Sequence, residues 1–100
     1  MPEMSFAVRW PDGRVEECYS PSLVVHEHLA AGATYTVTEL TDRAARAMAT
    51  ASDRVRERYG FACTSAAATA DQVRRSAVAY DPTALVEVVA MWPPLPEETR

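Results

Sequence analysis

The chain's histidines are the first candidates for chemistry, because imidazole binds metals and transfers protons near neutral pH. There are two, His26 and His28, in the segment HEH. Residues two apart share a face on a strand but not on a helix, and a zinc site needs three or four ligands with supporting hydrogen bonds. Both cysteines are far away in the sequence. We therefore expect a polar, partly exposed segment and no metal site.

The two cysteines, Cys18 and Cys63, are possible nucleophiles. A nucleophilic thiol needs a pKa lowered by a nearby base or by a helix N-terminus. Cys63 stands just before an expected helix, which would favour a thiolate, but no cysteine–histidine signature flanks either residue. Buried structural thiols are the favoured interpretation. The alternative is a small-molecule site between helices and sheet, formed by Cys63, Tyr35, Tyr59 or the histidines.

Carboxylate pairs could perform acid–base catalysis, and Asp12, Glu16 and Glu17 lie close in the sequence. Adjacent strand residues point to opposite faces, so Glu16 and Glu17 cannot converge on one substrate atom. We expect solvent-facing charges that protect a sheet edge from aggregation. The three glycines are isolated, so there is no phosphate-binding loop. The sequence predicts no catalytic residue and no cofactor.

The arginines raise the question of nucleic-acid binding. They alternate with acids around one expected helix, which is typical of a salt-bridged solvated face. The net charge is −4 and the pI about 5.1, whereas affinity for a phosphate backbone needs clustered cations. We expect no nucleic acid as a partner, and a transcriptional regulator is the weakest alternative. The arginines of this helix are Arg43, Arg46, Arg54, Arg56 and Arg58.

The segment RWPDGRVEECYS, residues 9–20, has the pattern of a hairpin. Alternating apolar residues predict a strand over 4–10, and Pro-Asp-Gly predicts a tight turn with glycine in the left-handed conformation. A return strand follows over 14–19. We expect Val15 and Tyr19 on its apolar face, interrupted by Glu17, and Glu16 and Cys18 on the other face.

The turn of this hairpin is the only candidate contact site that the sequence offers. Aromatic residues near an exposed loop can anchor a partner protein. We therefore assign partner binding to Trp10, Asp12, Gly13 and Tyr19. The competing interpretation is that both aromatic rings face the core.

The remaining elements are mostly helical. Residues 21–29 are a short helix capped by Ser20, or else a strand, because valines favour extended structure. The spacing T-x-x-E from Thr36 predicts a capping box and a helix over 37–59, which Gly60 ends. Its expected apolar stripe runs from Leu40 to Tyr59.

A second helix is expected from Thr64 or Ser65 to about Ala79. The run from Ala84 to Trp92 is apolar on both faces and predicts a strand covered on both sides. Residues 93–100 should be a flexible tail.

These elements predict a single α+β domain over residues 1–100, in which two helices cover one face of a small antiparallel sheet. Eighteen of the 100 residues are alanine, so the core should be thin and a homodimer that enlarges it is plausible. There is no signal peptide and no membrane-spanning run. Reduced thiols are the default in such a chain, so we expect a cytoplasmic protein with no membrane partner.

Three segments together resemble a small bacterial family of nitrogen starvation response proteins, encoded in a gene cluster beside a nitrilase. They are MPEMSFAVRWPDGRVEECYSPSLVVHEHL, GATYTVTEL and ASDRVRERYGFAC. The resemblance runs from Met1 to about Cys63 and fades in the second helix. Ala62 stands where the family has proline.

This resemblance implies a cytoplasmic protein made under nitrogen limitation, alongside a nitrilase, a radical-SAM protein, an acetyltransferase-like protein and a flavin-dependent oxidoreductase. It carries no catalytic residues that transfer to this chain. We therefore expect a small non-catalytic accessory protein that binds a protein from the same cluster. The alternative is a small-molecule-binding protein or small enzyme of that pathway.

Overall fold

The chain begins with the expected hairpin of strands β1 (Met4–Arg9) and β2 (Val15–Ser20). The structure is a computed structural model that describes residues 3–60 and 64–93. The expected link at 61–63, which includes Cys63, and the tail beyond residue 93 lie outside the described residues. In the turn, the Gly13 amide donates to the Trp10 carbonyl oxygen at 2.8 Å, and Gly13 has φ 91°. A left-handed glycine therefore closes the hairpin, as the sequence predicts.

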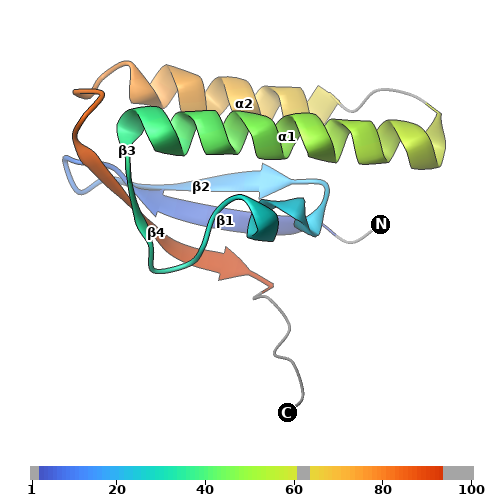
Figure 1. Cartoon of the computed structure of the whole chain (residues 1–100), viewed down its shortest axis with the longest axis horizontal. Helices are drawn as coiled ribbons and strands as arrows, with labels where there is room; N and C mark the ends of the chain where they lie inside the picture. The colour runs from blue at the N-terminus through green and yellow to red at the C-terminus, as the bar shows by residue number, and fades with distance from the viewer. Residues whose placement is uncertain (1–2, 61–63, 94–100) are drawn as a thin grey trace, which may run out of the picture.

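The sheet has four antiparallel strands in the order β2-β1-β4-β3 (Figure 1). β4 (Leu85–Trp92) lies between β1 and β3 (Thr34–Thr36). The sequence does not predict β3, because three residues are too few to show alternation. β2 is an edge strand, as expected.

The uncertain segment after the hairpin is a short 3₁₀ helix, η1 (Leu23–Glu27). The strand alternative is therefore wrong, and so is the predicted cap at Ser20. The Ser22 hydroxyl accepts from the Val24 amide at 3.2 Å, whereas Ser20 ends β2 and bonds the backbone of Ser22. His28 caps the end of this helix, and its amide donates to the Val25 carbonyl oxygen at 3.0 Å.

The two long helices agree closely with the sequence prediction. Helix α1 (Val37–Tyr59) begins at Thr36, whose hydroxyl accepts from the Glu39 amide at 3.0 Å, and ends at left-handed Gly60. Helix α2 (Thr64–Ala77) ends two residues before the predicted Ala79. At the end of α2, the amides of Ala79 and Tyr80 each donate to the carbonyl oxygen three residues earlier, which closes the chain into a turn.

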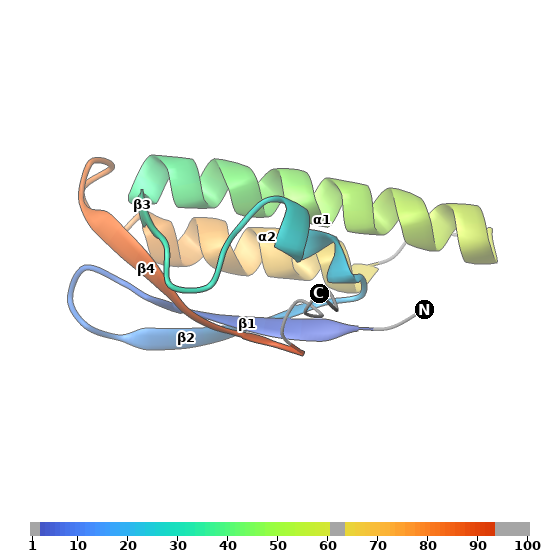
Figure 2. The ribbon, with the colours of Figure 1, turned by 60° about the horizontal axis from the view of Figure 1, so that its bottom comes forward.

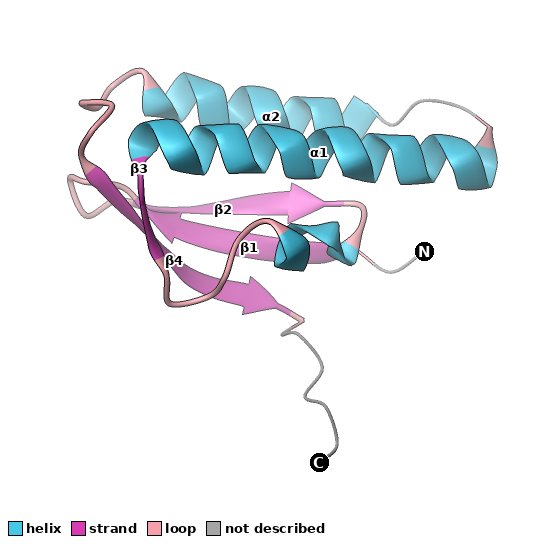
Figure 3. Ribbon diagram, viewed as in Figure 1, coloured by secondary structure: helices cyan, strands magenta, loops and turns pink. Residues whose placement is uncertain are grey.

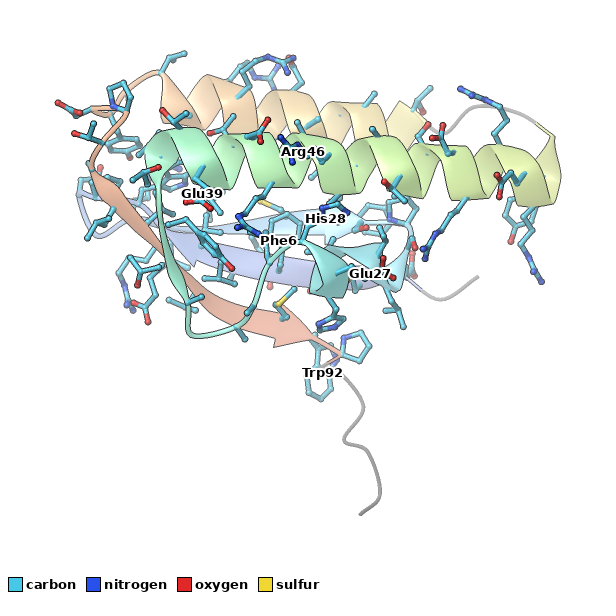
Figure 4. The ribbon with its side chains drawn as sticks, viewed as in Figure 1. Phe6, Glu27, His28, Glu39, Arg46 and Trp92 are labelled. Carbon is cyan, nitrogen blue, oxygen red and sulfur yellow. The ribbon has the colours of Figure 1, made fainter. Side chains whose placement is uncertain are left out.

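Both helices lie on one face of the sheet (Figures 1 and 3), so the predicted α+β architecture is confirmed. The core fills the space between the two layers, and Figure 4 shows Phe6 directed into it. The α1 stripe is buried as predicted from Leu40 to Val55, but the prediction for Tyr59 is wrong because its ring is half exposed. The helix extends beyond the sheet at that end (Figure 1).

The outer face of β4 departs from the prediction. Val86, Val88 and Met91 point into the core, whereas Leu85 is 61% and Trp92 71% exposed. Both helices pack on the same side, so the opposite side of the sheet is left open (Figure 2). Although β4 is apolar on both faces in the sequence, another layer of structure covers only one of them.

Candidate partner-binding surfaces

The conspicuous residues at the hairpin turn hold the turn against the end of α2. Trp10 is only 1% exposed and stacks on Tyr80, with ring centroids 5.3 Å apart and planes 8° apart. The Tyr80 hydroxyl donates to Asp12 at 3.0 Å, and the Arg14 amide donates to the other Asp12 oxygen at 2.9 Å. The Arg14 amide bond lowers the pKa of Asp12, and the Tyr80 bond acts in the same direction.

Glu16 completes this contact, which we call the hairpin clasp. The clasp joins the hairpin to α2 and to the turn after it. Its residues are Trp10, Asp12 and Glu16 of the hairpin, Gln72 and Ser76 of α2, and Tyr80 of the turn. The Glu16 carboxylate accepts from Trp10 Nε1 at 2.9 Å, from Ser76 Oγ at 2.6 Å and from Gln72 Nε2 at 2.7 Å. Burial by itself would raise the pKa of Glu16, but these three hydrogen bonds outweigh it and the pKa is lowered.

The prediction for the two faces of β2 is therefore wrong. Glu16 and Cys18 face the helices, whereas Val15 and Tyr19 lie on the open face. Glu16 is not a solvent-facing edge charge, because the donors on α2 satisfy it. The opposite orientation of Glu16 and Glu17 is as expected.

The four residues assigned to partner binding do not form one surface. Trp10 is buried in the hairpin clasp, whereas Asp12 and Gly13 are exposed at the turn. Tyr19 pairs with Ser5 at the opposite end of the hairpin, where its hydroxyl donates to Glu3 at 2.7 Å. Partner binding by Asp12, Gly13 and Tyr19 remains a prediction, as does partner binding by Trp10, whose ring is buried.

The groups weighed for chemistry do not converge in the part of the chain that the structure describes. Burial, and next the Glu16 and Glu17 carboxylates, raise the pKa of Cys18 to about 12, so its thiol is protonated near neutral pH. His26 Nε2 lies 3.0 Å from the Pro93 carbonyl oxygen. Residues 3–60 and 64–93 contain no group of three metal-binding side chains.

The described residues of the alternative small-molecule site between helices and sheet are spread along the length of α1, and Cys63 lies outside the described residues. Tyr35 precedes α1 and Tyr59 ends it, and a 23-residue helix separates them by roughly 34 Å. The Tyr35 hydroxyl accepts from the Ala30 amide at 3.1 Å, and Arg43 lies over its ring. His28 caps the end of η1, and its carbonyl oxygen accepts from Arg43 at 2.9 Å. Arg43 is roughly 24 Å along α1 from Tyr59.

A groove runs between α1 and α2 on the side away from the sheet. Its larger hollow, open to solvent, has a volume of about 680 Å³ between the first half of α1 and the end of α2, and Val78, which lines it, is 82% exposed. A smaller hollow of about 260 Å³ continues along the helices and shares Ala45. We call both together the interhelical groove. Its lining residues used below are Asp42, Ala45, Arg74 and Val78.

The side of the sheet away from the helices is a second uncovered surface, the open sheet face. Its members, in cross-strand rows, are Tyr19–Ser5–Trp92, Glu17–Ala7–Ala90 and Val15–Arg9–Glu87, with Leu85 beyond the last row. Arg9 and Glu87 form an ion pair at 2.8 Å. The four large hydrophobic residues of this face are exposed.

The outer edge of β2, in contrast, is covered. Thr69 Oγ1 donates to the Tyr19 carbonyl oxygen at 2.7 Å, and Gln72 Nε2 donates to the Glu17 carbonyl oxygen at 3.1 Å. These carbonyls would otherwise be acceptors for a strand of another chain. Sequence reasoning missed this role of α2, although Thr69, Gln72 and Ser76 are spaced three and four apart, which places these polar side chains on one helical face.

The fold and these surfaces define the class of protein: a small α+β protein whose most distinctive side chains connect its two layers. The interhelical groove and the open sheet face are left uncovered by the described residues. The family model of the nitrogen starvation-induced protein NitG matches residues 5–91, and the chain belongs to this family. The match extends well past Cys63, where the resemblance seen in the sequence fades. None of the curated proteins and none of the solved structures matches the chain. No helix of the described residues is long and apolar enough to cross a membrane.

Proposed function

We propose that this protein is a non-catalytic accessory protein of the nitrogen starvation response, which acts in the cytoplasm by binding a partner protein encoded beside it in a nitrilase gene cluster. Membership of the family supports the biological setting. The chemistry of the described residues supports an accessory role. The Cys18 thiol is protonated, and the Glu16 carboxylate is occupied by three donors of the protein itself.

The interhelical groove is the observation that carries this proposal. It is lined mainly by apolar side chains, with Asp42 and Arg74 among the lining residues, and these pair with Arg46 and Asp71. Alanine at position 45 lets a ligand backbone approach closely, and Val78 offers an exposed contact. Such a groove suits an amphipathic helix with apolar residues three and four apart.

The test is calorimetric titration of the full chain with each purified cluster protein, the nitrilase first. Ala45→Arg fills the groove and should abolish binding. Ala68→Arg is the matched control, because Ala68 is an exposed alanine of α2 outside the groove, so its replacement should leave affinity unchanged. Equal binding by both variants, or no binding by the unsubstituted chain to any cluster protein, would count against the proposal.

The volume of the larger hollow favours a second candidate function, binding of a small apolar molecule. About 680 Å³ is within the range of ligand pockets, and its walls are mainly apolar. Thermal-shift screening with nitriles, amides and amino acids tests this candidate, since a ligand stabilises by RT ln(1 + [L]/Kd). A ligand-induced shift that disappears in Ala45→Arg supports it. No shift with any compound removes it.

A further inference from the structure

We propose that one end of the open sheet face binds an arginine side chain of a partner protein. A hollow with a volume of about 390 Å³, open to solvent, lies at this end. We call it the aromatic hollow, and its lining residues used below are Glu3, Ser5, Tyr19, Trp92 and Pro93. Figure 4 shows Trp92 extending from the end of β4. The hollow lies on a different surface from the interhelical groove, so the inference goes beyond the proposed function.

The aromatic hollow has an aromatic side chain on each side and a small residue as its floor. Ser5 of β1 pairs with Tyr19 of β2 and with Trp92 of β4, so the three side chains lie on the same face of the sheet. Neighbouring strands are about 4.8 Å apart, so a group above Ser5 lies roughly 5 Å from the strand that carries either ring. A cation is attracted to an aromatic ring within about 6 Å of the ring centroid. The spacing therefore suits one cation between two rings.

The charges around the hollow also favour a cation. Glu3 Oε1 accepts from the Tyr19 hydroxyl at 2.7 Å, and Glu3 Oε2 has no partner among the described residues. Glu17 lies in the next cross-strand row of the same face. Arg9 is the basic residue of these rows, and its ion pair with Glu87 at 2.8 Å already neutralises it. Within the part of the chain that the structure describes, this end of the face is therefore negative, in a chain of net charge −4.

An arginine guanidinium matches these groups better than a lysine ammonium. It is planar and weakly hydrated, it stacks on aromatic rings, and it carries five N–H donors. Two acceptors are available to it in the hollow. One is Glu3 Oε2, and the other is the Ser5 hydroxyl, which makes no hydrogen bond to the described residues. A guanidinium therefore has a ring surface, a carboxylate and a hydroxyl within one hollow.

The shape of the hollow favours a side chain carried by a protein over a free small molecule. Small-molecule sites enclose most of the surface of their ligand, whereas Trp92 is 71% exposed and the hollow is open to solvent. A partner protein gains further contact with the rest of the face, where the small side chains of Ala7 and Ala90 follow in the next row. His26 Nε2 lies 3.0 Å from the Pro93 carbonyl oxygen, which connects the far end of the hollow to η1.

Fluorescence titration of the full chain with a capped Gly-Arg-Gly tripeptide, at constant ionic strength, tests the proposal. Trp10 is buried, so a change in emission reports on Trp92. We expect a saturable change with a dissociation constant in the millimolar range, as for a few ligand atoms. The matched control peptide carries citrulline, which has the shape of arginine without its charge, and it should give no saturable change. Equal responses to the two peptides, or no response to either, would overturn the inference.

Two glutamate substitutions locate the site. Glu3→Gln keeps an acceptor for the Tyr19 hydroxyl but removes the charge, so it should weaken binding of the arginine peptide about tenfold. Glu57→Gln is the matched control, because it makes the same change of charge at an exposed residue of α1, on the other side of the sheet. It should leave the affinity unchanged. Equal weakening by the two variants would show only an effect of net charge and would contradict the assignment.

Methylguanidinium distinguishes a free ligand from a protein side chain. The tripeptide should bind more tightly, because its backbone adds contact with the face, and equal affinity would overturn the assignment to a partner protein. These results are separate from the proposed function. Ala45→Arg fills the interhelical groove and should leave the affinity for the tripeptide unchanged, whereas Glu3→Gln should leave groove binding unchanged.

Discussion

Replacing Glu16 with alanine tests whether the hairpin clasp stabilises the fold. The Glu16 carboxylate accepts three hydrogen bonds, from Trp10, Gln72 and Ser76. Bonds to a charged group contribute about 1.5–3 kcal/mol each, and a buried donor left without an acceptor loses its full hydration. In the variant, the buried Trp10 Nε1–H group has no access to water. Gln72 and Ser76 are half-buried, so hydrogen bonds to water replace part of the energy that their donors lose.

We therefore expect Glu16→Ala to lower the free energy of unfolding by about 3 kcal/mol. That is a large share of the roughly 5–15 kcal/mol typical of a domain. It corresponds to a melting temperature lower by about 15 °C for a chain of this size.

Urea denaturation followed by far-ultraviolet circular dichroism and by tryptophan fluorescence measures this change. Glu17→Ala is the matched control, because this neighbour points away from the helices and only its backbone bonds Gln72. It should change stability by less than about 0.5 kcal/mol. Equal effects of the two substitutions would refute the reasoning, since the clasp would then contribute no more than an exposed edge charge.

The pH dependence gives an independent check on the same carboxylate. The pKa of Glu16 is lowered in the folded protein from an ordinary value of 4.5. The unfolded chain then binds the proton more tightly, so this stabilisation is complete above pH 4.5 and is lost as the pH falls through the folded pKa. The stability difference between wild type and Glu16→Gln should shrink over that range, and a constant difference would contradict the assignment.

Three further predictions concern the strands and helix ends. In a Cys63→Ser background, Cys18 should react with iodoacetamide only on unfolding, because its pKa is raised to about 12; rapid alkylation of the native protein would disprove this. The double variant Thr69→Val, Gln72→Leu should aggregate more in light scattering, because it uncovers the β2 carbonyls; unchanged scattering would show that the edge needs no cover. Thr36→Ala removes the α1 cap and should cost about 1 kcal/mol in urea denaturation, with no loss if the cap is dispensable.

The elements for which the sequence prediction agrees best with the structure are those that local signals specify. The turn at Gly13, the cap at Thr36 and the stop at Gly60 all agree with the structure. Each depends on backbone preferences and hydrogen bonds within a few residues, so neighbouring residues are enough to specify it. The antiparallel α+β layout followed from the order of these elements.

The residues of the candidate surfaces were harder to predict. The spacing of Gln72 and Ser76 on α2, and of Tyr80 in the turn after it, was visible in the sequence, but nothing local related it to the hairpin. The interhelical groove depends on how closely α1 and α2 approach, which their alanines permit but do not specify. Whether Trp10 faces the core was left open for the same reason, because its ring is covered by a residue that lies seventy positions later.

The sequence by itself determined where α1 begins and ends and where the hairpin turns, because those signals are local. Only the tertiary structure decided which face of β2 is buried. Apolar pattern favoured Val15 and Tyr19, but donors 56 and 60 residues away satisfy Glu16 and direct it inward. It also decided that the second apolar face of β4 stays open, because burial depends on what packs against a strand and not on the strand's own residues.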